Sequence, residues 1–143
     1  MCWRKQDRNP RTALKDVSMQ PSSIIGVVDD DPGVRGSIDS FIRSSGMTTI
    51  AFACAEDLLA SGTEDDLACI VTDIHMPGLS GLDLQREMKR RGWPHAIILM
   101  TAFPTPEARD QAMRAGAIAF LTKPIDPDHL LDAIESITDR SAG

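Results

Sequence analysis

Short apolar runs rich in β-branched residues alternate with helix-like segments along most of this sequence, and this alternation restricts the possible folds more than any other feature. Apolar runs without interleaved polar residues are typical of strands that are buried on both faces of a parallel sheet. We predict five such strands. They cover Ile24–Val28, Thr48–Phe52, Cys69–Thr72, Ala96–Met100 and Ala117–Leu121.

Helix signals fill the intervals between these runs. A capping side chain at the helix start, in most cases followed by proline, satisfies free amide groups and fixes the first helical turn. Such starts occur at Asp31-Pro32, Ser80–Asp83, Thr105-Pro106 and Asp126-Pro127, and a shorter helix is expected over Ala55–Ala60. Five strands and five helices in alternation predict an α/β, doubly wound fold with a parallel sheet.

Composition fits one such domain and excludes several other classes of protein. The chain has 143 residues, of which 42% are hydrophobic, and carries 15 Lys and Arg against 21 Asp and Glu, a net charge of −6. This acidic balance argues against direct nucleic-acid binding. No apolar run approaches the roughly 20 residues that span a bilayer. Three scattered cysteines (Cys2, Cys54 and Cys69) indicate neither a disulfide framework nor a zinc site, and they suit the reducing cytoplasm.

The first residues differ in charge from the rest. Residues 1–20 contain five Lys or Arg and two Asp, a net charge of +3, and lack apolar periodicity. We therefore predict a basic, disordered N-terminal tail over residues 1–22 and a folded domain over 23–143. Met19 is an alternative start of the protein.

Chemically useful side chains follow the predicted strands. Asp29, Asp30 and Asp31 follow the first run, and Asp73 follows the run at Cys69–Thr72. Thr101 follows the run at Ala96–Met100, and Lys123-Pro124 comes after the last run. Ligands of open parallel sheets bind at the carboxyl ends of the strands. We therefore expect these carboxylates, the hydroxyl and the ammonium group to meet on one rim of the sheet.

Each of these groups has a chemical use at such a rim. Clustered carboxylates repel one another unless a cation neutralises them, and hard oxygen ligands suit Mg²⁺. An aspartate can attack phosphorus to form an acyl phosphate. The charge that develops in this reaction requires a metal, a cation and hydrogen-bond donors, and Lys123 and Thr101 can supply the last two.

In these residues the sequence resembles the receiver domains of response regulators in two-component signalling, and most closely those of nitrogen-fixation and nitrate regulators. The resemblance covers about residues 23–140 and rests on Val27–Asp31, Asp73–Gly78, Thr101-Ala102 and Lys123-Pro124. It implies a flavodoxin-like (βα)5 fold with strand order 2-1-3-4-5.

The resemblance also implies a role for each site residue. Asp73 would be the phosphoacceptor, which takes a phosphoryl group from a sensor histidine kinase or a histidine phosphotransfer protein. Asp29, Asp30, Asp73 and the backbone carbonyl of His75 would bind Mg²⁺ (or Mn²⁺), with Asp30 the more direct ligand of the acidic pair. Lys123 would contact the phosphoryl oxygens, and would pair with Asp73 when phosphate is absent.

The family further implies a conformational switch. Thr101 would turn toward the phosphoryl group and Phe120 would move into the space that Thr101 leaves. This would repack the 4-5-5 face, formed by the fourth helix (about Thr105–Ala115), the fifth strand and the fifth helix. A downstream protein that the sequence does not identify, or a second copy in a homodimer, would bind this face.

Two side chains beside the expected site bear on the lifetime of the acyl phosphate, and one peptide bond has an expected geometry. His75 and Phe103 occupy positions that flank the path of the hydrolysing water in the family. The bulky, apolar Phe103 predicts slow to moderate autodephosphorylation. The Lys123–Pro124 bond is expected to be cis, as it is in the family.

Three alternatives remain open at this point. An aspartate-nucleophile phosphatase of the haloacid-dehalogenase type would carry a second Asp where this chain has His75. A flavin carrier would not place three carboxylates beside the FMN phosphate. A binding module that uses the receiver fold without phosphorylation would be expected to lack part of the site. Whether the chain acts alone or belongs to a longer regulator is also open.

Overall fold

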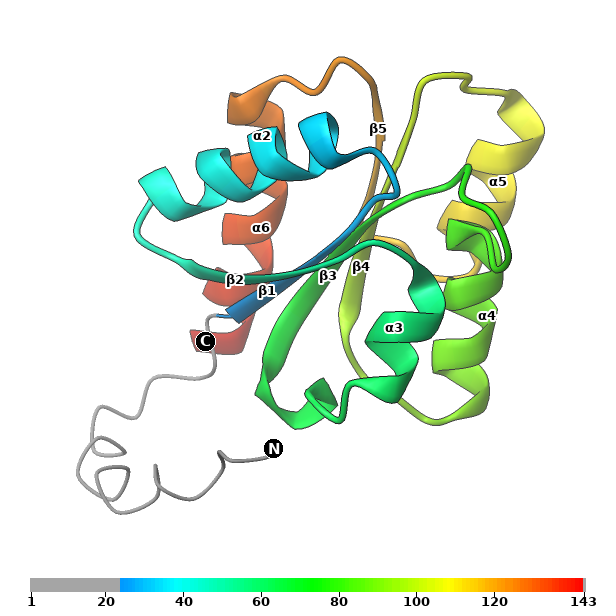
Figure 1. Cartoon of the computed structure of the whole chain (residues 1–143), viewed down its shortest axis with the longest axis horizontal. Coiled ribbons are helices and arrows are strands. Elements are labelled where there is room, and N and C mark those ends of the chain that lie inside the picture. Colours follow the sequence, from blue (N-terminus) through cyan, green and yellow to red (C-terminus); the bar gives the residue numbers. More distant parts are fainter. Residues whose placement is uncertain (1–23, 143) are drawn as a thin grey trace.

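A single five-stranded parallel sheet organises the protein. The structure, a computed structural model, describes residues 24–142 (Figure 1), and the predicted tail over residues 1–22 lies outside them. The strands are β1 (Ile24–Val28), β2 (Thr48–Phe52), β3 (Leu67–Asp73), β4 (Ala96–Thr101) and β5 (Ala119–Thr122). Their order in the sheet is β2-β1-β3-β4-β5, which confirms the predicted fold class and strand order.

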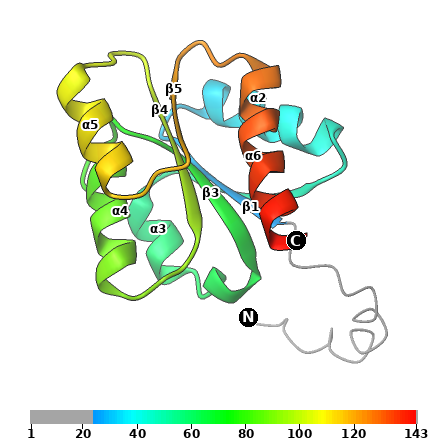
Figure 2. The same cartoon turned by 180° about the vertical axis from the view of Figure 1, so that it is seen from behind.

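Helices cover both faces of the sheet. As Figures 1 and 2 show, α2 (Pro32–Ser44) and α6 (Pro127–Ala142) lie on one face, and α3 (Ala55–Ala60), α4 (Gly81–Arg90) and α5 (Pro106–Arg114) lie on the other. A short 3-10 turn, η2 (Glu64–Asp66), precedes β3. No helix within residues 24–142 combines the length and the apolar character that crossing a membrane requires.

The central strands contribute to two hydrophobic cores, one on each face. In β4, Ile98 and Met100 pack with α2 and α6, whereas Ile97 and Leu99 pack with α3, α4 and α5. All four side chains are buried. Since successive side chains of a strand point to opposite faces, burial on both faces requires an uninterrupted apolar run. This explains why the sequence shows such runs instead of an alternating pattern.

The predicted helix starts are confirmed. The Asp31 carboxylate accepts hydrogen bonds from the amides of Gly33 and Val34, and the Thr105 hydroxyl accepts one from Ala108. Ser80 and Asp83 form the predicted reciprocal capping box of α4.

The last strand begins later than predicted. We expected a strand from Ala117, but the Ala117 amide donates to the carbonyl of Ala112 and closes the end of α5, with Gly116 in the left-handed region (φ 99°). β5 therefore starts at Ala119 and extends to Thr122, directly before Lys123.

Candidate functional site

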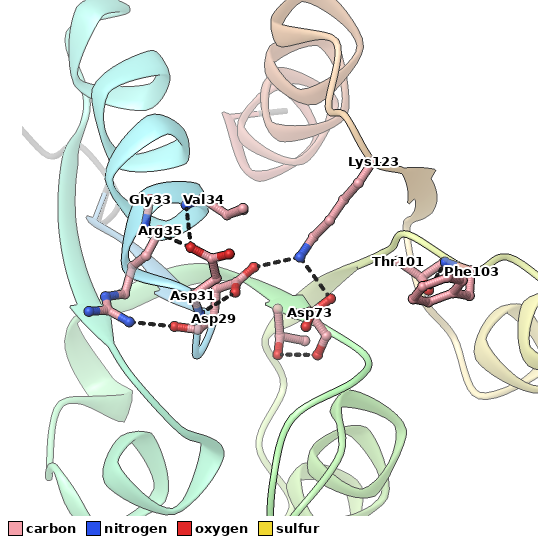
Figure 3. Close-up of polar contacts among 10 residues, drawn as sticks. Asp29, Asp31, Gly33, Val34, Arg35, Asp73, Thr101, Phe103 and Lys123 are labelled. Carbon is pink, nitrogen blue, oxygen red and sulfur yellow. Dashed lines mark hydrogen bonds and ion pairs between the residues drawn. The ribbon is translucent and has the colours of Figure 1, made fainter.

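Four of the side chains predicted to share one rim lie close together at the carboxyl ends of the strands, and Figure 3 shows three of them, Asp29, Asp73 and Lys123. The Asp31 carboxylate instead caps α2, and the Thr101 side chain has no recognised contact with the cluster among the described residues. Asp29 and Asp30 follow β1, Asp73 is the last residue of β3, and Lys123 follows β5. Asp29, Asp30 and Asp73 each offer a carboxylate oxygen, and these oxygens lie within 4.8 Å of one another. Asp29 and Asp73 are buried, whereas Asp30 is exposed to solvent.

Lys123 bridges two of these carboxylates. Its Nζ lies 2.9 Å from Oδ2 of Asp29 and 3.1 Å from Oδ1 of Asp73. The contact with Asp73 is the one that the family resemblance implies for the unphosphorylated state, and the contact with Asp29 is additional. The Lys123 amide donates to the Thr101 carbonyl oxygen at 2.8 Å, and the Lys123–Pro124 bond is cis.

Burial and charge shift the pKa values of this group. Burial raises the pKa of Asp73 above its ordinary value, since the opposing hydrogen bond and charge of Lys123 do not fully compensate for it, and the charges of Asp29 and Asp30 act in the same direction as burial. Burial by itself would lower the pKa of Lys123, but its contacts with Asp29 and Asp73 outweigh burial and raise it. The site therefore holds more negative charge than its one lysine neutralises.

The turn after β1 is braced from two sides. The Asp31 amide donates to Oδ1 of Asp29 at 2.9 Å, and Nη1 of Arg35 donates to the Asp29 carbonyl oxygen at 2.6 Å. Arg35 lies on α2, whose first turn Asp31 caps. The Asp31 amide thus orients the Asp29 carboxylate, and Arg35 holds the main chain of the same residue. Arg35 was not predicted as a site residue, although its position one helical turn after Asp31 is a signal that the sequence contains.

The segment after β3 is held by a close helix approach. The Gly81 amide, at the start of α4, donates to the Ile74 carbonyl oxygen. A Cβ atom on Gly81 would lie 2.3 Å from the carbonyl oxygen of Asp73 and 3.0 Å from Cα of Ile74. The Glu56 carboxylate accepts a hydrogen bond from the Leu79 amide in the same segment. The sequence placed Gly81 only in the predicted helix start at Ser80–Asp83, because the close approach of α4 to the end of β3 leaves no local pattern.

The residues expected to act as switch and lifetime groups are neighbours. Thr101 is fully buried, and its hydroxyl accepts a hydrogen bond from the Phe103 amide at 2.9 Å. Phe103 is 72% exposed, and its ring meets the His75 ring edge-on, with centroids 5.9 Å apart. In Figure 3, Thr101 and Phe103 lie on the opposite side of Asp73 from Asp29. The half-buried Phe120 lies on β5 beside Leu99.

The donor set suits a hard divalent cation. Three carboxylates, two of them buried and facing one lysine, form a group whose mutual repulsion a divalent ion would relieve. Oxygen ligands with room for water molecules are the type that Mg²⁺ prefers. The residues present therefore fit the metal that the sequence analysis expects.

Comparison with known proteins agrees with the fold. Residues 25–135 match the response regulator receiver domain family. The chain is 36% identical over 138 residues to Nodulation protein W of Bradyrhizobium diazoefficiens and 39% identical over 124 residues to the transcriptional regulatory protein FixJ of Azorhizobium caulinodans, covering 96% and 87% of this chain. These alignments cover 58% and 59% of those proteins, so the chain spans about three fifths of their length.

Solved structures show the same likeness. The crystal structure of FixJ-N superposes with a TM-score of 0.74 at 28% identity, covering 81% of this chain and 93% of that one. The response regulator StyR gives a TM-score of 0.77 at 37% identity, covering 83% of this chain and 60% of that one. The predicted resemblance to the receiver domains of response regulators is thereby confirmed, with relatives that include FixJ and Nodulation protein W. The chain belongs to the response regulator receiver domain family.

Proposed function

We propose that Asp73 is the phosphoacceptor of this receiver domain. A carboxylate oxygen of Asp73 attacks the phosphorus of a phosphohistidine, a new O–P bond forms, the N–P bond breaks, and the imidazole of the donor leaves with the electron pair. The donor is a sensor histidine kinase or a histidine phosphotransfer protein. The observation that carries the proposal is the meeting of Asp29, Asp30 and Asp73 within 4.8 Å, with Lys123 Nζ 3.1 Å from Asp73.

The same residues would balance the negative charge of the phosphoryl group during the reaction. Asp29, Asp30, Asp73 and the backbone carbonyl of His75 would hold Mg²⁺ or Mn²⁺. When bound, this ion would neutralise the acidic cluster and the phosphoryl oxygens. Lys123 is already placed beside Asp73, so its ammonium group can move to a phosphoryl oxygen without leaving the rim. Thr101 can donate its hydroxyl hydrogen to another phosphoryl oxygen.

Phosphorylation acts as a switch through Thr101 and Phe120. The phosphoryl group adds roughly 1.5 to 2 negative charges and three acceptor oxygens at the rim. Thr101 turns toward them, Phe120 fills the space that it leaves, and the 4-5-5 face, here α5, β5 and α6, repacks. Moving a two-state equilibrium from 1:99 to 99:1 takes roughly 5.5 kcal/mol of differential stabilisation, which a few charge-assisted contacts can supply.

The proposal also covers the domain bounds, the cellular location and the partners of the protein. Residues 23–143 form the receiver domain and residues 1–22 precede it as a basic tail. The domain works in the cytoplasm, contacts proteins instead of nucleic acid through the 4-5-5 face, and catalyses only its own phosphoryl transfer and slow dephosphorylation. The family match supports neither a phosphatase nor a flavin carrier. The presence of Asp29, Asp30, Asp73, Thr101 and Lys123 argues against a phosphorylation-independent module.

Intact-mass measurement after incubation with acetyl phosphate and Mg²⁺ tests the proposal. We expect one phosphoryl adduct on the wild-type protein and none on Asp73→Asn. Asp57→Asn is the matched control, because Asp57 is an exposed carboxylate on α3 outside the acidic cluster. An adduct on Asp73→Asn would refute the assignment of the phosphoacceptor, and an adduct that forms equally well in the presence of a chelator would refute the metal role.

A further inference from the structure

The guanidinium group of Arg109 lies against the ring of Phe120. Arg109 extends from α5 toward β5, and its Cζ is 5.9 Å from the Phe120 ring centroid. Both side chains line a surface pocket of about 320 Å³, together with Pro104, Thr105, Pro106 and Thr122. A cation over the face of an aromatic ring at this distance is attracted by the negative charge of the ring face.

No residue in the described part of the chain competes with the ring as an ionic partner of Arg109. Among the described residues it takes part in no ion pair, whereas Arg43, Arg86, Arg90 and Arg91 each pair with a carboxylate. The residue is exposed and the Phe120 ring is half-buried. Within the described part of the chain, the Arg109 guanidinium therefore interacts as a cation with the Phe120 ring and with no carboxylate.

The strand register shows what an inward movement of the ring would break. Thr101 pairs with Thr122 and Leu99 pairs with Phe120 across β4 and β5. Since residues two apart on a strand share a face, Thr101 and Phe120 point into the same helical layer, diagonally across the two strands. Thr101 is fully buried, so we expect a ring that moves into the space of its side chain to leave the surface pocket and Arg109.

We infer that Arg109 is a positioning residue that holds Phe120 in its outward position and so sets the resting population of the switch. The inference rests on the proposed function, in which Phe120 moves inward on phosphorylation. A contact made in only one of two states shifts their equilibrium by the whole of its strength. For an exposed cation–π pair this amounts to roughly a two- to fivefold change.

Binding of beryllofluoride, a phosphoryl mimic, in the presence of Mg²⁺ measures this bias. Arg109→Met removes the cation and keeps the stem, and we expect it to bind the mimic roughly two- to fivefold more tightly than the wild type does. Arg109→Lys keeps a cation and should bind with nearly wild-type affinity. Arg114→Met is the matched control, because Arg114 lies on the same helix, makes no ion pair among the described residues and lines a different pocket.

The expected direction separates this effect from simple electrostatics. Loss of a positive charge near an anion site weakens anion binding, so tighter binding by Arg109→Met cannot arise from the change in net charge. In a Phe120→Leu background, Arg109→Met should leave the affinity unchanged.

The outcomes also separate the inference from the function on which it rests. If Arg109→Met binds the mimic as tightly as the wild type does, or more weakly, the inference alone is overturned. A tightening that persists in Phe120→Leu, or that Arg114→Met reproduces, would overturn it as well. If the wild-type protein neither binds the mimic nor accepts a phosphoryl group from acetyl phosphate, the proposed function fails and the inference fails with it.

Discussion

At the scale of single residues, the side chain and the main chain of Asp29 make different contacts. The carboxylate faces Lys123, whereas the carbonyl oxygen accepts the bond from Nη1 of Arg35. A residue that orients a metal ligand contributes to affinity without touching the ion. We therefore expect Arg35→Met to weaken Mg²⁺ binding roughly tenfold in a calorimetric titration. Arg43→Met on the same helix, where Arg43 pairs with Asp39, should bind Mg²⁺ like the wild type, and equal affinities for all three proteins would contradict the role of Arg35.

Phe103 provides a second prediction at this scale. Its exposed ring contacts His75 beside Asp73 and can obstruct the water that hydrolyses an acyl phosphate. A polar amide in its place can hydrogen-bond to that water. We expect Phe103→Gln to shorten the half-life of the phosphoryl adduct about three- to tenfold, a change of order 1 kcal/mol in the barrier, measured by mass spectrometry over time. Phe103→Leu should keep the slow rate, and a wild-type half-life of seconds would argue against any obstruction.

Much of the site was predictable from sequence because one rule places it. Polar residues that follow buried parallel strands meet at one rim, and this rule located Asp29, Asp73 and Lys123 without any knowledge of side-chain positions. The double contact of Lys123, the brace from Arg35 and the ring contact of His75 with Phe103 depend on how far particular side chains reach. Sequence spacing does not encode that reach, so these contacts emerged only from the structure.

At the scale of elements, the start of α4 is constrained by the strand that carries Asp73. Gly81→Ala would place Cβ 2.3 Å from the Asp73 carbonyl oxygen, and backbone atoms cannot yield cheaply. We expect a loss of about 1–3 kcal/mol in the free energy of unfolding, measured by urea denaturation. Gly36→Ala is the matched control in α2, since nothing lies within 4 Å of its Cβ position, and should stabilise the protein by about 0.5–1 kcal/mol. A neutral Gly81→Ala would show that α4 can shift away from β3.

Element boundaries were predicted best where a local side chain fixes them. Asp31, Ser80 and Thr105 cap their helices as their positions indicate, because a cap is a contact between near neighbours in sequence. The start of β5 was wrong by two residues. There the backbone of Ala117 completes the turn after α5, and its apolar side chain carries no sign of that bond.

At the scale of the whole molecule, the site and its proposed output lie in different parts of the fold. The rim lies where β1, β3 and β5 end, whereas α5, which the proposed movement of Phe120 would affect, lies beside β5 at one edge of the sheet (Figure 1). On that helix Met113 follows Arg109 by one turn and is 39% exposed, an unusual exposure for a large apolar side chain in this fold. Residues one turn apart share a helix face, so Met113 extends the face that Arg109 presents toward β5.

This placement makes Met113 a test of the proposed homodimer. A phosphorylated domain that pairs through the 4-5-5 face would bury Met113, and an Asp there would bring an unpaired charge into the interface. We expect beryllofluoride with Mg²⁺ to shift the wild-type protein toward a dimer in analytical ultracentrifugation, and Met113→Asp to weaken that dimer at least about tenfold while acetyl phosphate still labels Asp73. Ala60→Asp, an exposed site on α3 at the other end of the same layer, is the control and should dimerise normally. Because labelling and assembly are measured separately, a Met113→Asp protein that dimerises like the wild type would place the interface on another face without affecting the role of Asp73.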